Sequence, residues 1–197
     1  MHPAAEYGVT MKRFLIGLVA ALIFSAQGSE ANSGPRHGLS VFGDLKYSAN
    51  FKNFDYATPT APKGGTIKIL GLDTFETIHP FILKGRKDVL AERLLYDTLM
   101  ARSVDEPDSY YGLVAKTVEV PDDKSWVAFN LDPRAKFHDG TRITADDIIF
   151  TFNALTKYGH PRFRMNFRDV ASAEAISPSR VKFTFKPGTH RDLPTRL

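Results

Sequence analysis

Two pairs of neighbouring residues in the sequence have the composition of a reactive site. His138 stands directly before Asp139, and a histidine beside a carboxylate can act as a general base or bind a metal ion. Asp146 and Asp147 form a carboxylate pair of the kind that acid–base catalysis uses. One alternative is therefore a hydrolase or a metal-dependent enzyme that uses His138 and Asp139.

The backbone around these residues explains them without catalysis. Asp139-Gly140 is a turn signal, because glycine takes positive φ without steric cost and aspartate accepts bonds from the backbone two residues on. Thr144 and Asp147 have the spacing of a capping box, and carboxylates there face the positive end of a helix dipole. We interpret these four residues as a structural turn and a helix cap, and we expect no catalytic residue in the chain.

A helix that begins at Ala145 needs a sheet to pack on. Its apolar residues form a single stripe, made by Ile148, Ile149, Phe152 and Leu155. Upstream, apolar residues alternate over 127–131, which predicts a strand, and the range 113–131 predicts a hairpin. A second hairpin is predicted over 171–185, with one face made by Val181, Phe183 and Phe185. The predicted fold class is thus α/β, a mixed sheet with helices.

The remaining segments are assigned from shorter patterns. Residues 66–71 predict a short strand after an extended segment over 32–64. Residues 88–100 predict a core helix whose apolar face consists of Leu90, Leu94, Leu95 and Leu99. Residues 105–112 predict a loop. The alternating basic and aromatic residues of 161–168 predict a half-buried extended segment rather than a nucleic-acid contact.

The N-terminal segment has the layout of a secretory signal peptide. A basic pair precedes an apolar run over 14–24, and cleavage is expected after Ala31. Residues 1–10 precede a second methionine and are interpreted as extra N-terminal residues. The apolar run is shorter than the stretch of about 20 residues that a membrane-spanning helix needs. The chain is therefore divided into a signal peptide over 1–31 and a mature part over 32–197, which does not span a membrane.

Composition excludes several classes of function. The chain has no cysteine, which excludes disulfides, thiolate metal sites, a cysteine nucleophile and a lipid-bearing N-terminal cysteine. It has no G-x-S-x-G motif, no G-x-x-x-x-G-K-[ST] motif and no two histidines at the spacing of a zinc site. The net charge of +4 is scattered along the sequence and favours no particular partner. These observations favour a periplasmic binding protein with no cofactor and no metal ion.

Residues 112–152 resemble the signature region of the family 5 bacterial extracellular solute-binding proteins, which are the substrate-capturing components of peptide-type ABC importers. The resemblance rests on the sequence GLVAKTVEVPDDKSWVAFNLDPRAKFHDGTRITADDIIFTF. Residues 72–85 and the sequence YDTL at 96–99 are similar to the subgroup of the microcin-C and oligopeptide importers. The resemblance implies a fold like that of the type II periplasmic binding proteins.

Members of this family hold their ligand between two lobes and are much longer than this chain. The resemblance therefore implies an N-terminal fragment that contains only the first lobe, in incomplete form, and that does not bind ligand alone. In the first lobe, the loop after the strand at 66–71 is expected to line the ligand cleft. The residues implied for ligand binding are Asp73, Thr74 and Phe75.

The resemblance also implies the partners of the protein. The expected ligand is an oligopeptide or a peptide-like compound, and the expected protein partner is an ABC permease in the inner membrane. No nucleic acid is expected. Two alternatives stay open: a periplasmic hydrolase or metal-dependent enzyme at His138 and Asp139, and the binding of nickel or haem on the same fold.

Overall fold

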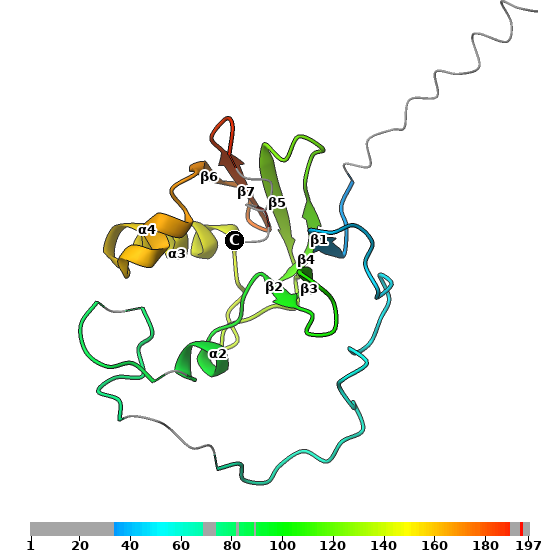
Figure 1. Ribbon diagram of the computed structural model, residues 1–197, viewed down its shortest axis with the longest axis vertical. Helices are drawn as coiled ribbons and strands as arrows, with labels where there is room; N and C mark the ends of the chain where they lie inside the picture. Colours follow the sequence, from blue (N-terminus) through cyan, green and yellow to red (C-terminus); the bar gives the residue numbers. More distant parts are fainter. Residues whose placement is uncertain (1–33, 69–73, 82, 89, 190–193, 195–197) are drawn as a thin grey trace, which may run out of the picture. The chain divides into compact units, whose positions relative to one another are not determined.

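The two predicted hairpins form one antiparallel sheet in the computed structural model of the chain (Figure 1). The structure describes residues 34–68, 74–81, 83–88, 90–189 and 194, which all belong to a unit that spans Ser33–Leu197. The signal peptide predicted over 1–31 lies outside the described residues. The strands of this sheet are β4 (Ala115–Glu119), β5 (Trp126–Leu131), β7 (Arg180–Phe185) and β6 (Val170–Ser177), in that spatial order.

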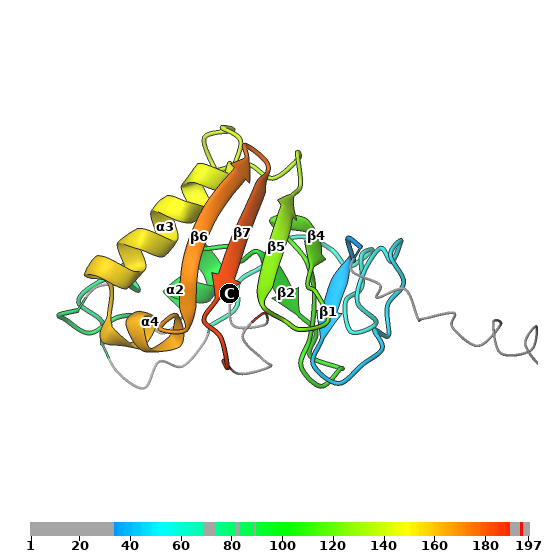
Figure 2. The same ribbon diagram turned by 90° about the horizontal axis from the view of Figure 1, so that it is seen from above.

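The order of the strands confirms both hairpins and adds a pairing between them. Within each hairpin, β4 pairs with β5 and β6 pairs with β7. The hairpins join through β5 and β7, with Phe129 opposite Val181 and Val127 opposite Phe183. Figure 2 shows the four strands side by side, with β7 between β5 and β6. β7, the last strand among the described residues, therefore lies inside the sheet.

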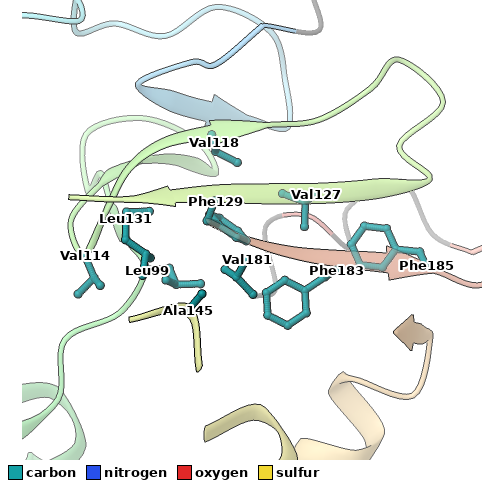
Figure 3. Close-up of a cluster of buried hydrophobic side chains, with 11 residues drawn as sticks. Leu99, Val114, Val118, Val127, Phe129, Leu131, Ala145, Val181, Phe183 and Phe185 are labelled. Carbon is teal, nitrogen blue, oxygen red and sulfur yellow. The ribbon is translucent and has the colours of Figure 1, made fainter. Parts of the chain in front are cut away.

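The apolar face of this sheet is the core of the structure. The predicted alternation is confirmed, since Val127 and Val181 are fully buried and Phe129 and Phe183 nearly so. Figure 3 shows these side chains together with Leu131 and with the first helical residue of α3. The rings of Phe129 and Phe183 meet edge to face, at 6.2 Å between centroids.

Helix α3 (Ala145–Tyr158) covers this face, as its apolar stripe predicts. Ile148, Ile149 and Phe152 pack against the buried cluster, and the Phe152 ring lies 5.5 Å from the ring of Phe183. A second helix, α4 (Pro161–Asn166), follows directly and contacts α3. The contact between Phe152 and Phe183 therefore joins α3 to β7.

The extended segment predicted over 161–168 is wrong, because most of it forms α4. His160 caps the helix by accepting a bond from the amide of Arg162, and Pro161 occupies the first turn, where a missing N–H costs nothing. Phe163 is buried, and Phe167 lies 5.4 Å from the Phe152 ring. The aromatic residues four apart face inward on a helix, whereas the alternation suggested a strand.

A second sheet was not predicted. It contains β1 (Gly38–Ser40), β3 (Ser109–Gly112) and β2 (Met100–Arg102), with β3 in the middle. The loop expected over 105–112 is therefore wrong for its second half, which forms β3. These strands are too short for a clear alternation, and β1 pairs with a partner about 70 residues away in the sequence.

The core helix expected over 88–100 is confirmed only in part, as a shorter and exposed helix. The helix α2 covers only Ala91–Leu95, and Leu94 and Leu95 are 77% and 56% exposed. Leu99 is buried, but its carbonyl accepts bonds from the amides of Leu113 and Ala115, at 3.2 and 2.9 Å. This pairing holds the segment after α2 extended, because the same backbone groups cannot also bond within a helix.

The strand expected over 66–71 is not seen in its described part. Residues 66–68 form no strand, and Ile67 is 86% exposed. Residues 69–71 lie outside the described residues. A β-branched run becomes a strand only where a neighbour supplies backbone partners, and among the described residues none does so for 66–68.

Phe183→Ala tests the core. The change removes a buried ring that contacts both Phe129 and Phe152, so we expect the free energy of unfolding to fall by about 3–5 kcal/mol. Urea unfolding followed by circular dichroism measures the difference. The matched control is Phe150→Ala, since Phe150 lies on the outer side of α3 and is 74% exposed. Equal losses in the two variants would contradict this assignment of the core.

Candidate functional site

The Asp139-Gly140 turn uses its carboxylate to hold the backbone. One carboxylate oxygen of Asp139 accepts bonds from the amide and the hydroxyl of Thr141, at 2.9 and 2.7 Å. These bonds lower the pKa of Asp139. Gly140 has a φ of 89°, which a residue with a side chain rarely adopts. In the described turn, the structure shows no hydrogen bond between Asp139 and the exposed His138.

The start of α3 is closed by a capping box. The hydroxyl of Thr144 accepts from the amide of Asp147, and the carboxylate of Asp147 accepts from the Thr144 amide at 2.8 Å. The next amide, that of Ala145, donates to the carbonyl of Pro178 in the β6–β7 turn, at 2.9 Å. The turn and the cap thus fix the point where α3 meets the sheet, as the Thr-x-x-Asp spacing predicts.

The loop that was predicted to contact ligand is described only in part. Asp73 lies outside the described residues. Thr74 and Phe75 are exposed, and 56% of the Phe75 surface is accessible. They precede a segment that closes on itself, because the amides of Glu76 and Thr77 both donate to the carbonyl of Arg86. The structure therefore places an exposed aromatic ring and a hydroxyl at the entrance of a closed loop.

This loop is attached to the helical part of the core through Phe81. Its ring lies 4.8 Å from the Tyr96 ring and 5.9 Å from the ring of Phe163 on α4. The loop is thus a different element of the chain from the turn at Asp139.

A polar network around Tyr47 was not predicted. The Tyr47 hydroxyl donates to Asp105 at 2.5 Å and accepts from the Asp55 amide at 2.9 Å. The Lys46 ammonium bridges the carboxylates of Asp105 and Asp55, at 2.6 and 2.7 Å. It holds the pKa of Asp105 well below its usual range. The network ties the segment after β1 to the turn of the β2–β3 hairpin.

The fully buried Tyr111 lies at the centre of the aromatic residues beside this network. Its ring is within 5.6 Å of the rings of Tyr47, Phe51 and Phe54, and its hydroxyl donates to Glu106 at 2.7 Å. Burial raises the pKa of Tyr111 to about 12. In the sequence, the aromatic residues at 47, 51 and 54 could have indicated such a cluster. Their partner, Tyr111 on β3, is far along the chain.

The face of the four-stranded sheet opposite α3 carries a second network. Arg180 on β7 reaches across β5 and binds both oxygens of Glu119 on β4, at 2.5 and 2.8 Å. Asn130 on β5, between them, bonds to Glu119 and Arg180. The Arg180 guanidinium lowers the pKa of Glu119, which is only 8% exposed. The network therefore links three strands through one buried carboxylate.

The described residues offer neither a metal site nor a membrane-spanning helix. No group of three or more histidine, cysteine or carboxylate side chains there could hold a metal ion. In the same part of the chain, no helix has the length and apolar character needed to cross a membrane. The polar side chains of the networks described above bond to one another. Among the described residues, no buried side-chain nitrogen or oxygen lacks a hydrogen-bond partner.

Residues 109–196 match the family model "Bacterial extracellular solute-binding proteins, family 5 Middle". The matched range begins at β3 and contains the whole four-stranded sheet with α3 and α4. This segment is similar to family 5 of the bacterial extracellular solute-binding proteins. The family match thus covers the two confirmed hairpins and α3, and also the segments of β3 and α4, where the predictions were wrong.

Three known proteins show how far the similarity extends. The peptidoglycan-binding protein YepA of Agrobacterium fabrum is 42% identical over 83% of this chain and 28% of its own length. A protein of the same organism named as a probable peptide-binding protein, YejA, is 35% identical over 92% of this chain and 30% of its own length. The crystal structure of NikZ from Campylobacter jejuni, in complex with Ni(L-His), is 26% identical and has a TM-score of 0.49 over 64% of this chain and 24% of that one.

The chain spans less than a third of the length of the curated relatives described above. Most of each relative therefore has no counterpart in this chain. That includes any part of the relative that packs against its own copy of this segment.

Arg180→Leu tests the three-strand network. It leaves the Glu119 carboxylate buried without its cation, so we expect a loss of about 1–3 kcal/mol in the free energy of unfolding at neutral pH. Because the folded pKa of Glu119 is lowered, its contribution is complete above the usual glutamate pKa of about 4.3 and is lost as the pH falls through the folded pKa. The difference between wild type and variant should therefore shrink at acidic pH, as measured by urea unfolding.

The control for this experiment is Arg134→Leu. Arg134 also pairs with a carboxylate, that of Asp132, but its side chain is 88% exposed. We expect this control to cost no more than about 0.5 kcal/mol. A difference for Arg180→Leu that stays constant from neutral to acidic pH would show that the ion pair is not its cause.

Proposed function

We propose that the chain is the N-terminal part of a periplasmic substrate-binding component of an ABC importer for oligopeptides or peptide-like compounds. In this proposal residues 32–197 form an incomplete first lobe of a type II periplasmic binding protein, close to the microcin-C and oligopeptide subgroup. Its protein partner is the importer's permease in the inner membrane. The observation that carries the proposal is the 42% identity to a peptidoglycan-binding protein over 83% of the chain.

The names of the two relatives agree on the chemical class of ligand. One is named for peptidoglycan, whose cross-links are peptides, and the other for peptides. Peptides share a backbone of amide donors and carbonyl acceptors, so a protein that accepts many of them bonds to that backbone and leaves loose pockets for side chains. This supports peptide-like compounds as the ligand class rather than one defined molecule.

Asp73, Thr74 and Phe75 are the residues that we assign to ligand contact. Thr74 offers a hydroxyl, and Phe75 offers an exposed ring that a bound peptide can cover. The bonds that close the segment behind them onto Arg86 limit how far Phe75 can move. An aromatic side chain on a restrained loop loses little conformational freedom on binding, which favours affinity.

The hydrolase alternative has less support from the site. The carboxylates of Asp139 and Asp147 accept hydrogen bonds that hold a turn and a helix start. A general base must instead reach the proton that it removes, with its own geometry fixed by another residue. These carboxylates therefore support an architectural role, in line with a protein that binds a substrate without transforming it.

A chimeric protein tests the ligand class and the loop together. Residues 32–197 replace the matching segment of YepA, so that the loop is measured within a protein of the relatives' full length. We expect isothermal titration with mixed tri- to hexapeptides to show binding. We expect Phe75→Ala in the chimera to weaken it about tenfold, because a ring covered by the ligand is lost.

Phe42→Ala is the control in the same chimera, since Phe42 is also exposed, at 71%, but lies near β1. A folded chimera that binds no peptide, when YepA itself binds one, would overturn the proposed ligand class. A chimera that binds equally well with and without Phe75 would overturn only the assignment of the loop.

Export is a separate part of the proposal. We expect the protein to leave the cytoplasm through residues 11–31 and to be cleaved after Ala31. N-terminal sequencing of the protein recovered from the periplasm should therefore begin at Asn32. Recovery of the intact chain from the cytoplasm alone would contradict this expectation.

A further inference from the structure

Helix α2 exposes a continuous group of large apolar side chains. These are Leu90, Leu94, Leu95 and Tyr96, all of them exposed, and we call them the α2 surface. The Leu94 amide donates to the Leu90 carbonyl at 3.0 Å, so these two side chains are neighbours one helical turn apart. Leu95 and Tyr96 follow Leu94 directly in the chain. The four side chains therefore form one patch.

The α2 surface has no partner of its own kind in the described part of the chain. There, α2 makes no extensive contact with any other helix or strand. Only the Tyr96 ring meets another large apolar side chain, that of Phe81 in the preceding loop, at 4.8 Å. A helix of five residues is not stable through its backbone bonds alone, since isolated helices shorter than about 12–15 residues are marginal in water. Its stability must therefore come from packing of its apolar side chains.

The chemistry of the patch determines what kind of surface fits it. Leucine side chains have no hydrogen-bonding groups, so a complementary surface must itself be apolar. The charged residues at the border, Arg93 and Asp97, are both exposed and opposite in sign, and they favour neither an anionic nor a cationic partner. The α2 surface thus fits an apolar protein surface, and it does not fit a peptide backbone or a layer of lipid headgroups.

The lengths of the relatives indicate which protein provides that surface. Any continuous range that covers 83% of the 197 residues contains α2, so the match to YepA includes it. The same match takes up only 28% of YepA. The relative therefore has a counterpart of this segment together with a much larger part that lies outside the match. That larger part is long enough to cover the patch, because apolar patches of this kind are rarely left open in a folded protein.

We infer that the α2 surface docks onto an apolar surface of a full-length solute-binding protein, in the part that lies outside the segment matched here. The inference rests on the proposed function, because it takes the chain to be one part of such a protein. Tyr96 contacts Phe81, and Phe81 belongs to the loop that follows Phe75. Docking of α2 therefore also restrains the loop that we assign to ligand contact.

Thiol labelling tests this inference, because the chain has no cysteine of its own. Leu94→Cys is made in the full chain and in the chimera in which residues 32–197 replace the matching segment of YepA. The rate of maleimide labelling at position 94 is measured by mass spectrometry of the peptide that contains it. We expect labelling to be at least about tenfold slower in the chimera, because a covered thiol reacts only when the contact opens. The control is Asp122→Cys in the exposed β4–β5 turn, which should be labelled equally fast in both proteins.

Equally fast labelling at position 94 in the full chain and in a folded chimera would overturn the inference. Slow labelling in the full chain that becomes faster on dilution would overturn it in favour of a second copy of the chain as the partner. If the chimera does not fold, the cysteine is placed in YepA itself, at the position that aligns with Leu94, where fast labelling would again overturn the inference. A chimera that protects position 94 but binds no peptide would contradict the proposed ligand class and support the docking of α2.

Discussion

The structure depends on the burial of one face of the β4–β5–β7–β6 sheet. Phe129 and Phe183 supply the large side chains of that face, and Phe152 of α3 packs on Phe183 from outside the sheet. Without a helix on this side, the alternating residues of β5 and β7 would expose a continuous apolar surface to water. The turn at Asp139, the capping box and α4 must therefore all be compatible with the position of α3 on this face.

The residues that look reactive in the sequence serve that constraint. Asp139 shapes the turn before α3, and Thr144 with Asp147 fixes its first turn, while the Ala145 amide joins the helix start to the β6–β7 turn. Residues 112–152, which resemble the family signature, thus contain the turn and the cap that join α3 to the sheet. Its polar residues are explained by backbone geometry, which is the expected use of Asp-Gly and Thr-x-x-Asp sequences.

The sequence predicted those elements whose partners are close in the chain or whose pattern is long. The two hairpins, the 14-residue helix α3 and its N-terminal cap each satisfy one or both of these conditions. The Tyr47 and Glu119 networks satisfy neither, because the partners of Tyr47 and Glu119 are about 60 residues away. Alternation over 161–168 was misleading, since Phe163 and Phe167 fit both a strand and a helix face, and His160 with Pro161 decides for the helix.

The place of β7 inside the sheet has a consequence for the order in which a ribosome delivers the chain. β5 emerges with β4 already beside it, but the residue opposite Asn130 on its other edge, Arg180, is 50 residues later. Until then one edge of β5 has no partner, and any extended segment with free backbone groups can pair with it. Nascent chains of this protein thus pass through a stage at which a holdase chaperone has a specific strand to protect.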